Sequence, residues 1–248
     1  MPPVFFKPPT ITNLGAWIET AANAAPSLPT YYYHIPSMTG VNFDMIDLVE
    51  EMDRRGVDNF AGVKYTGLYE TRAFPDAMRC AAYKDGKYEI LSGREELMIE
   101  SLATGIEGFI GSQFNFAGDV YNAIFSETDT VKRNALQLAS IELLYAWLEN
   151  VPSTIDGNKL MVNLAGVPIG TASSLFDHAM ACLCTPPTHP HTCSPTCPRK
   201  RTGPARLPML PPSEEDVATL KAAVQAWCDE YASIFDNGVA ICRAIDTA

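Results

Sequence analysis

Lys64 is the residue whose type and position could most directly do chemistry, because it ends the short apolar run 60–63. Lysine side chains are rarely fully buried unless they are paired or functional. In a buried lysine the charged form is disfavoured, so some free amine exists near neutral pH. A free amine beside a dry pocket is what Schiff-base chemistry with a carbonyl substrate requires. The structural alternative is a lysine that snorkels from a strand end to solvent.

Strand and helix patterns alternate on both sides of this lysine. The expected strand starts recur at intervals of about 30 residues or somewhat less, the size of a βαβ unit, which predicts parallel strands with covering helices. One helix is expected to begin after an Asn42 N-cap and to end at Gly56. The expected strands are 4–6, 30–33, 59–64, 88–92 and 108–112, and the other helices are 10–25, 68–83 and 94–103.

The carboxyl ends of the expected strands carry polar side chains. Ligands of parallel α/β folds bind at these ends. Tyr33 and Lys64 end consecutive strands, which are usually spatial neighbours. A phenol, an amine, hydroxyls and a glycine backbone are therefore expected to share one mouth, formed by Lys7, Tyr33, Lys64, Ser92, Gly93 and Ser112.

Composition narrows the class of protein. The chain has 248 residues, 47% of them hydrophobic, which is ample for one large domain or two small ones. The net charge of −11 disfavours a nucleic-acid partner. No apolar run is long enough to span a bilayer, and the N-terminal apolar patch is too short for a signal peptide. We therefore expect a cytoplasmic protein, with Cys80, Cys228 and Cys242 as reduced thiols.

After Ser112 the pattern becomes helical. Apolar spacing predicts helices over 119–125, 130–150 and 156–164. Ser213 and Asp216 resemble a capping box that opens a helix running to about Ile234. These helices are expected to buttress the sheet or to build an oligomer contact.

Four ordered motifs carry a resemblance to a known family: YYYHIPSMTGV (31–41), GVK (62–64), SGREE (92–96) and GFIGSQFN (108–115). Together they resemble the dihydrodipicolinate synthase / N-acetylneuraminate lyase family of class I aldolases, and its lyase branch in particular. The resemblance covers most of 3–170 and resumes from Gly203. It implies a (β/α)₈ TIM barrel with extra C-terminal helices, usually assembled as a tetramer. The chain looks like about strands 4–8 of that barrel, a partial α/β barrel lacking the N-terminal third.

The resemblance also implies roles for single residues. Lys64 matches the Schiff-base lysine, and Tyr33 matches the tyrosine that carries a proton during carbon–carbon cleavage. Thr66 matches a substrate-contacting hydroxyl. The implied reaction is the cleavage of N-acetylneuraminate to N-acetylmannosamine and pyruvate, without a metal or organic cofactor. The positions that match those holding the polyhydroxy tail are Gly93, Glu95, Glu96 and Ser112.

Each of these residues also has a purely structural interpretation. Tyr33 could simply pack as one of three consecutive aromatic residues. Glu95 and Glu96 could be the acidic first turn of a helix, and Thr66 could be a turn residue. Other family activities stay open: a dihydrodipicolinate synthase-like reaction or the cleavage of another keto-deoxy sugar. A non-catalytic fragment is the third possibility, since an open sheet would expose two edges and an apolar face.

The expected organisation has four parts: a partial barrel over 1–127, helices over 128–170, an irregular insertion over 171–202 and a turn with helices over 203–248. The insertion holds four of the 7 cysteines and three of the 4 histidines, and it could be a translated intron. Zinc binding is the alternative, although the cysteine spacing is not a usual paired-knuckle spacing. The zinc candidates are Cys182, Cys184, Cys193, Cys197, His189 and His191.

Overall fold

The computed structural model describes residues 1–67, 72–151, 153–167, 169 and 212–245. It divides into two compact units, Met1–Gly111 and Ser112–Ala248, each of which is described by itself. The predicted insertion at 171–202, with its zinc candidates, lies outside the described residues.

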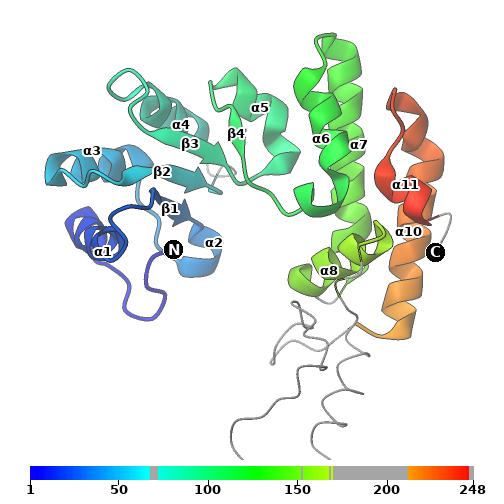
Figure 1. The fold of residues 1–248 in the computed structure, drawn as a ribbon, viewed down its shortest axis with the longest axis horizontal. Coiled ribbons are helices and arrows are strands. Elements are labelled where there is room, and N and C mark those ends of the chain that lie inside the picture. The colour runs from blue at the N-terminus through cyan, green and yellow to red at the C-terminus, as the bar shows by residue number, and fades with distance from the viewer. Residues whose placement is uncertain (68–71, 152, 168, 170–211, 246–248) are drawn as a thin grey trace, which may run out of the picture. The chain divides into compact units, whose positions relative to one another are not determined.

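Unit 1 contains a four-stranded parallel sheet in the order β1-β2-β3-β4 (Figure 1). The strands are β1 (Thr30–His34), β2 (Phe60–Tyr65), β3 (Glu89–Ser92) and β4 (Gly108–Phe109). The predicted α/β arrangement of parallel strands and intervening helices is confirmed.

The strand predicted at 4–6 is wrong. This segment forms bends, and the Phe5 and Phe6 side chains are 85% and 82% exposed. Prolines stand on both sides of the segment, at 2–3 and 8–9. Proline has no N–H to donate to a strand ladder, so three apolar residues between proline pairs offer too few donors to join a sheet.

The helices of unit 1 follow the strands in sequence. They are α1 (Ile11–Asn23), α2 (Pro36–Thr39), α3 (Met45–Arg55), α4 (Ala73–Ala82), the 3₁₀ turn η1 (Glu95–Leu97) and α5 (Met98–Ala103). Helix α3 ends at Gly56 as predicted, with φ of +66°, a backbone conformation that glycine adopts without steric cost. Pro75 lies in the first turn of α4, where its missing N–H costs nothing.

The predicted Asn42 cap of α3 is wrong, because the N-cap residue is Asp44 and its side chain makes no capping bond. The first amides of the helix are bonded by Asp76 of α4 instead. Its two oxygens accept from Met45 N at 2.6 Å and from Ile46 N at 3.1 Å. The cap therefore comes from a residue about 30 positions later in the chain.

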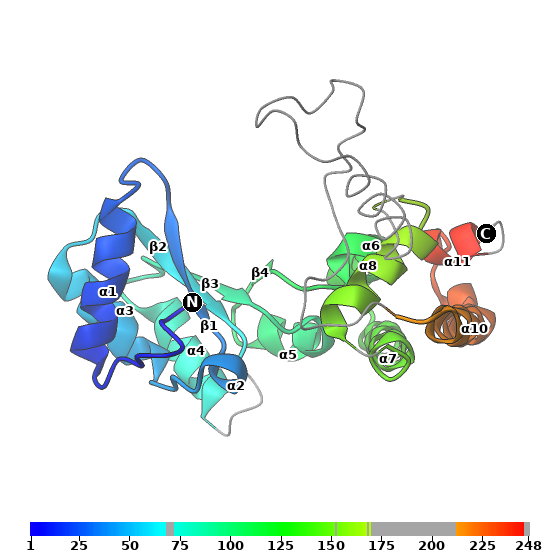
Figure 2. The same ribbon diagram turned by 90° about the horizontal axis from the view of Figure 1, so that it is seen from below.

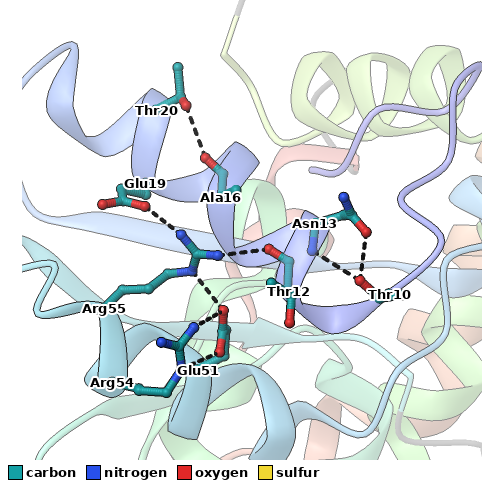
Figure 3. Close-up of polar contacts among 9 residues, drawn as sticks. All are labelled: Thr10, Thr12, Asn13, Ala16, Glu19, Thr20, Glu51, Arg54 and Arg55. Atoms are coloured by element: carbon teal, nitrogen blue, oxygen red, sulfur yellow. Dashed lines mark hydrogen bonds and ion pairs between the residues drawn. The ribbon is translucent and has the colours of Figure 1, made fainter.

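A polar cluster joins α1 to α3 (Figure 3). Arg55 donates to Glu51 at 2.7 Å, to Glu19 at 2.6 Å and to the Thr12 carbonyl at 2.9 Å. Arg54 makes a two-pronged contact to the same Glu51 carboxylate, with both distances 2.8 Å. These bonds fix two of the helices that cover one face of the sheet to each other.

Successive side chains along β1 and β2 point to two faces of the sheet that differ in burial. Side chains on one face belong to the buried core with residues of α1, α3 and α4, among them Leu14, Ile18, Met45, Val49, Met52 and Ala77. On this face β1 and β2 contribute Tyr32, Val63 and Tyr65. On the opposite face Tyr33 and Lys64 are half-buried. The predicted site residues of β1 and β2 therefore lie on the less covered face.

Unit 2 is helical in its described residues, as predicted. Helices α7 and α10 contact each other, and both are seen nearly end-on in Figure 2. Trp227 of α10 donates its indole N–H to the Ala139 carbonyl of α7 at 2.7 Å. The capping box of Ser213 and Asp216 is confirmed at the start of α10. The elements are α6 (Phe114–Ser126), α7 (Thr130–Leu148), α8 (Thr154–Leu164), α10 (Glu214–Tyr231), η2 (Ala232–Ile234) and α11 (Ala240–Ile245).

The expectation of reduced thiols is wrong for two of its three cysteines. Cys228 of α10 and Cys242 of α11 form a disulfide, whereas Cys80 is free and buried. The chain turns back through η2, which brings the two Cα atoms within 5.5 Å. Such a reversal is a tertiary feature that helical periodicity alone does not reveal. Within the described parts of the chain, no helix combines the length and apolarity that crossing a membrane requires.

Candidate active site

Lys64 and Tyr33 lie side by side on adjacent strands. The parallel register of β1 and β2 pairs their Cα positions. The Lys64 Nζ atom lies 4.2 Å from the centroid of the Tyr33 ring, a cation–π distance. Both side chains are half-buried, so the amine keeps access to a ligand. The structure thus brings together the two residues predicted to be neighbours.

Gly93, just after β3, packs against the Lys64 side chain. Its amide donates to the Tyr65 carbonyl at 2.8 Å, continuing the strand ladder past Ser92. A Cβ atom placed on Gly93 would lie 3.0 Å from Lys64 Cε and would clash with the Thr66 methyl group. The absence of a side chain therefore lets the chain after β3 pass directly over the lysine stem.

Thr66 is buried two residues beyond the lysine. Its hydroxyl donates to the His34 carbonyl, and its backbone N–H donates to the same oxygen at 3.0 Å. In this structure the hydroxyl therefore supports the ends of β1 and β2. Its lone pairs can still accept a hydrogen bond, so the predicted substrate contact stays a prediction.

Glu95 and Glu96 follow in the first turn of η1 and are buried, at 5% and 9% exposure. Glu96 pairs with Arg94 at 3.6 Å, and Arg94 donates to the Thr66 carbonyl at 2.9 Å. The Glu95 carboxylate lies against the backbone of Gly111. The segment after β3 thus holds two carboxylates and one guanidinium near the end of β2.

Ser112 is the first residue of unit 2. Its carbonyl accepts hydrogen bonds from Asn115 at 2.9 Å and from Asn158 at 2.8 Å. The predicted role of its hydroxyl in holding substrate stays a prediction.

Three residues that sequence reasoning missed support the site from the covered face of the sheet. Asp76 accepts a hydrogen bond from the Tyr65 hydroxyl at 2.9 Å besides capping α3. His34 is buried at 1% exposure, and neither ring nitrogen makes a hydrogen bond to another described residue. Burial lowers the pKa of His34 to about 4, against smaller opposing effects of Asp76 and Asn42. For His34 and Tyr65 the available signal is the period-two alternation of the strands, which separates them from Tyr33 and Lys64; Asp76, on α4, has no such signal.

The arrangement joins two chemical capacities. An accessible primary amine can attack a carbonyl carbon and form an imine. A phenol in contact with that amine can carry a proton to or from the same bound molecule.

A separate hollow of about 490 Å³ lies in unit 2 between α6, α7 and the segment around η2. Lys132 bridges Glu127 at 3.1 Å and Asp236 at 2.7 Å at this hollow. It contains none of the predicted site residues.

Comparison with known proteins gives the same family as the sequence motifs. The model of the dihydrodipicolinate synthetase family matches residues 1–174. N-acetylneuraminate lyase of Danio rerio is 30% identical over 173 residues, which cover 68% of this chain and 54% of the relative. N-acetylneuraminate lyase of Gallus gallus is 27% identical over 233 residues, 92% of this chain and 63% of the relative. The chain therefore spans less than two thirds of these curated relatives.

Solved structures agree on the fold. N-acetylneuraminate lyase (sialic acid aldolase) from Aliivibrio salmonicida superimposes with a TM-score of 0.62 at 28% identity, covering 91% of this chain and 63% of that one. The sialic acid aldolase of Ruminococcus gnavus gives a TM-score of 0.66 at 19% identity, covering 92% and 64%. At that lower identity the likeness shows the fold alone.

Proposed function

The chain belongs to the dihydrodipicolinate synthetase family, and from that premise we propose that it is a Schiff-base aldolase that cleaves N-acetylneuraminate to N-acetylmannosamine and pyruvate. The observation that carries this proposal is the contact between the Lys64 amine and the Tyr33 ring on adjacent strand ends. The names of the Danio rerio and Gallus gallus relatives support the choice of sugar.

The proposed reaction uses these two side chains in sequence. Lys64 Nζ attacks the keto carbon, and loss of water gives a protonated imine. Tyr33 then accepts the proton of the hydroxyl that becomes the aldehyde, while the carbon–carbon bond breaks and its electrons enter the imine. Protonation of the resulting enamine and hydrolysis release pyruvate and the free lysine. In this scheme no metal or organic cofactor takes part.

The remaining predicted residues would hold the substrate. We propose that the polyhydroxy tail contacts the segment after β3 through Gly93, Glu95 and Glu96, and that Thr66 and Ser112 contribute hydroxyl groups. Burial of both glutamates next to Arg94 supports this proposal, because ordered carboxylates can accept hydrogen bonds from several sugar hydroxyls. Glu95 stands where the family more often has aspartate, which leaves the preferred sugar to experiment.

We further propose that this four-stranded parallel sheet is part of a TIM barrel with C-terminal helices beyond it. The boundaries of the four predicted parts, 1–127, 128–170, 171–202 and 203–248, belong to this proposal, as does a cytoplasmic location. A four-stranded parallel sheet leaves the site open unless further strands close it, so we expect impaired activity from these residues alone. Lyase activity from a soluble monomer of these residues would contradict that expectation, and a transcript lacking codons 171–202 would support an intron.

Borohydride trapping with pyruvate, followed by intact-mass measurement, tests the central step. We expect a single covalent adduct that is absent in Lys64→Ala and present in Lys84→Ala, the matched control at a lysine paired with Asp53. Soluble, folded protein that gives no adduct would refute the proposal and favour a non-catalytic fragment. If the adduct forms, incubation with N-acetylneuraminate is the second assay. Release of N-acetylmannosamine would distinguish a lyase from a dihydrodipicolinate synthase-like enzyme or an aldolase of another keto-deoxy sugar.

A further inference from the structure

The segment after β3 is bonded to the end of the lysine's strand at two successive residues. The Gly93 N–H donates to the Tyr65 carbonyl at 2.8 Å, and Arg94 Nε donates to the Thr66 carbonyl at 2.9 Å. These two carbonyls belong to the residues that directly follow Lys64. The path of the segment is therefore set relative to the residue that carries the amine.

The Arg94 side chain joins this strand end to the Glu96 carboxylate. Its Nη1 atom lies 3.6 Å from Glu96 Oε1, while its Nε holds the Thr66 carbonyl. A guanidinium group presents its N–H donors in a rigid planar fork, so contacts from two of its nitrogens fix the relative positions of two acceptors. Glu96 is buried and Arg94 is half-buried, and charges that are shielded from water attract each other more strongly.

The backbone of Arg94 is anchored as well. Its N–H donates to the Ser92 hydroxyl at 3.3 Å, and that hydroxyl donates to the Arg94 carbonyl at 3.3 Å. Ser101 of α5 donates to the same Ser92 oxygen at 3.1 Å, and both serines are buried. A side chain that starts from an anchored backbone can hold its partner precisely. The neighbouring Glu95 carboxylate lies against the Gly111 backbone instead.

We propose that Arg94 is a positioning residue for the polyhydroxy tail of the substrate. It holds the Glu96 carboxylate at a fixed place relative to the Lys64 amine, so that the tail hydroxyls meet an acceptor when the keto carbon meets the amine. Arg94 takes no part in the covalent steps. Binding of a keto sugar acid should therefore depend on Arg94, whereas binding of pyruvate, which has no tail, should not. This inference rests on the proposed Schiff-base function and names a determinant of its specificity.

The test compares two ligands of the same amine in the full chain. Trapping with cyanoborohydride in the presence of pyruvate or of N-acetylneuraminate, followed by intact mass, gives an initial rate for all adducts together. The rate at increasing ligand concentration gives the half-saturating concentration of each ligand. We expect Arg94→Gln to raise that of N-acetylneuraminate by about tenfold, the size expected when the contacts of a charged group are lost. The half-saturating concentration of pyruvate should stay unchanged.

Matched variants separate positioning from general support of the fold. Arg94→Lys keeps the charge but lacks the planar fork, so it should give a smaller rise than Arg94→Gln. In a Glu96→Gln background, Arg94→Gln should have little further effect, because the two residues act as one unit. Arg54→Gln removes a guanidinium group that pairs with Glu51 at 2.8 Å on α3, and it should change neither concentration. Circular dichroism checks that each variant is folded, and Arg94→Lys carries the test if Arg94→Gln is not.

Equal rises for both ligands in the Arg94 variants would overturn the inference, because Arg94 would then act on the amine or on the fold. An unchanged value for N-acetylneuraminate would also overturn it, as would full additivity with Glu96→Gln. The absence of any pyruvate adduct from the folded, unsubstituted chain is the separate failure of the Schiff-base function. Calorimetry then decides the inference: weaker binding of N-acetylneuraminate by Arg94→Gln supports it, and equal or undetectable binding overturns it.

Discussion

The two faces of the sheet in unit 1 differ in chemistry although their residues alternate along the same strands. On β1, Tyr32 and His34 are buried in the core, whereas Tyr31 is exposed and Tyr33 is half-buried. On the covered face the polar groups serve structure: Asp76 joins Tyr65 to the start of α3. The other face keeps an amine, a phenol and a carboxylate accessible. Strand alternation thus separates the scaffold from the reactive groups by one residue.

The largest expected effect is on the cleavage rate, and it comes from a substitution of Tyr33 on the less covered face. Tyr33→Phe keeps the ring beside Lys64 but removes the proton carrier, so the cleavage of N-acetylneuraminate should slow by about 10²–10⁴-fold. Trapping with pyruvate should persist, since the amine is unchanged. Steady-state release of N-acetylmannosamine, compared with the trapped mass, checks this separation.

Tyr145→Phe, at an exposed position of unit 2, is the matched control and should cleave normally. Loss of trapping in Tyr33→Phe would mean that the phenol also sets the position or charge of the amine. Unchanged cleavage would mean that Tyr33 only packs beside Lys64 and carries no proton.

Adjacent residues of β3 allow the same contrast to be measured as stability. Ile90 is in the core and Leu91 is half-buried on the other face. Ile90→Ala should lower the free energy of unfolding by about 3 kcal/mol, because it leaves a cavity among packed side chains. Leu91→Ala should cost about 1 kcal/mol, since less apolar surface is removed from contact. Urea denaturation of both variants gives the comparison, and equal losses would show that the second face is buried in solution.

Sequence reasoning found most of the elements of unit 1 and the Lys64–Tyr33 pair, because periodicity and strand order are local signals. It missed Asp76, since a carboxylate inside a helix gives no sign that it caps another helix. It placed reduced thiols at Cys228 and Cys242, because the reversal through η2 depends on tertiary packing. It also expected a strand over 4–6 from apolar character, where the flanking prolines decide otherwise.

Because of His34, we expect the free energy of unfolding to fall as the pH is lowered. Its folded pKa of about 4 lies below the ordinary value of 6.5, so the unfolded chain takes up a proton first as the pH falls. The stabilising contribution is present above about pH 6.5 and is lost between about 6.5 and 4. From about pH 7.5 to 5 the loss should reach about 2 kcal/mol.

His34→Phe keeps an aromatic ring in the same buried place and removes the titrating group. Urea unfolding at the two pH values should therefore show a smaller loss in this variant than in the unsubstituted protein. An identical loss in both would assign the acid sensitivity to other groups, such as the carboxylates paired with Arg55.

Thr66 gives the smallest expected change and the finest distinction, because its hydroxyl could serve the scaffold, the substrate or both. Thr66→Val removes the bond to the His34 carbonyl, but that oxygen still accepts from the Thr66 N–H. The unfolding free energy should therefore fall by only about 1 kcal/mol, and Thr66→Ser should restore the hydroxyl. If the hydroxyl also contacts substrate, the pyruvate concentration needed for half-maximal trapping should rise several-fold in the valine variant and return in the serine variant. A stability loss without that rise would leave Thr66 as part of the scaffold alone, placed beside the lysine only because the strand ends there.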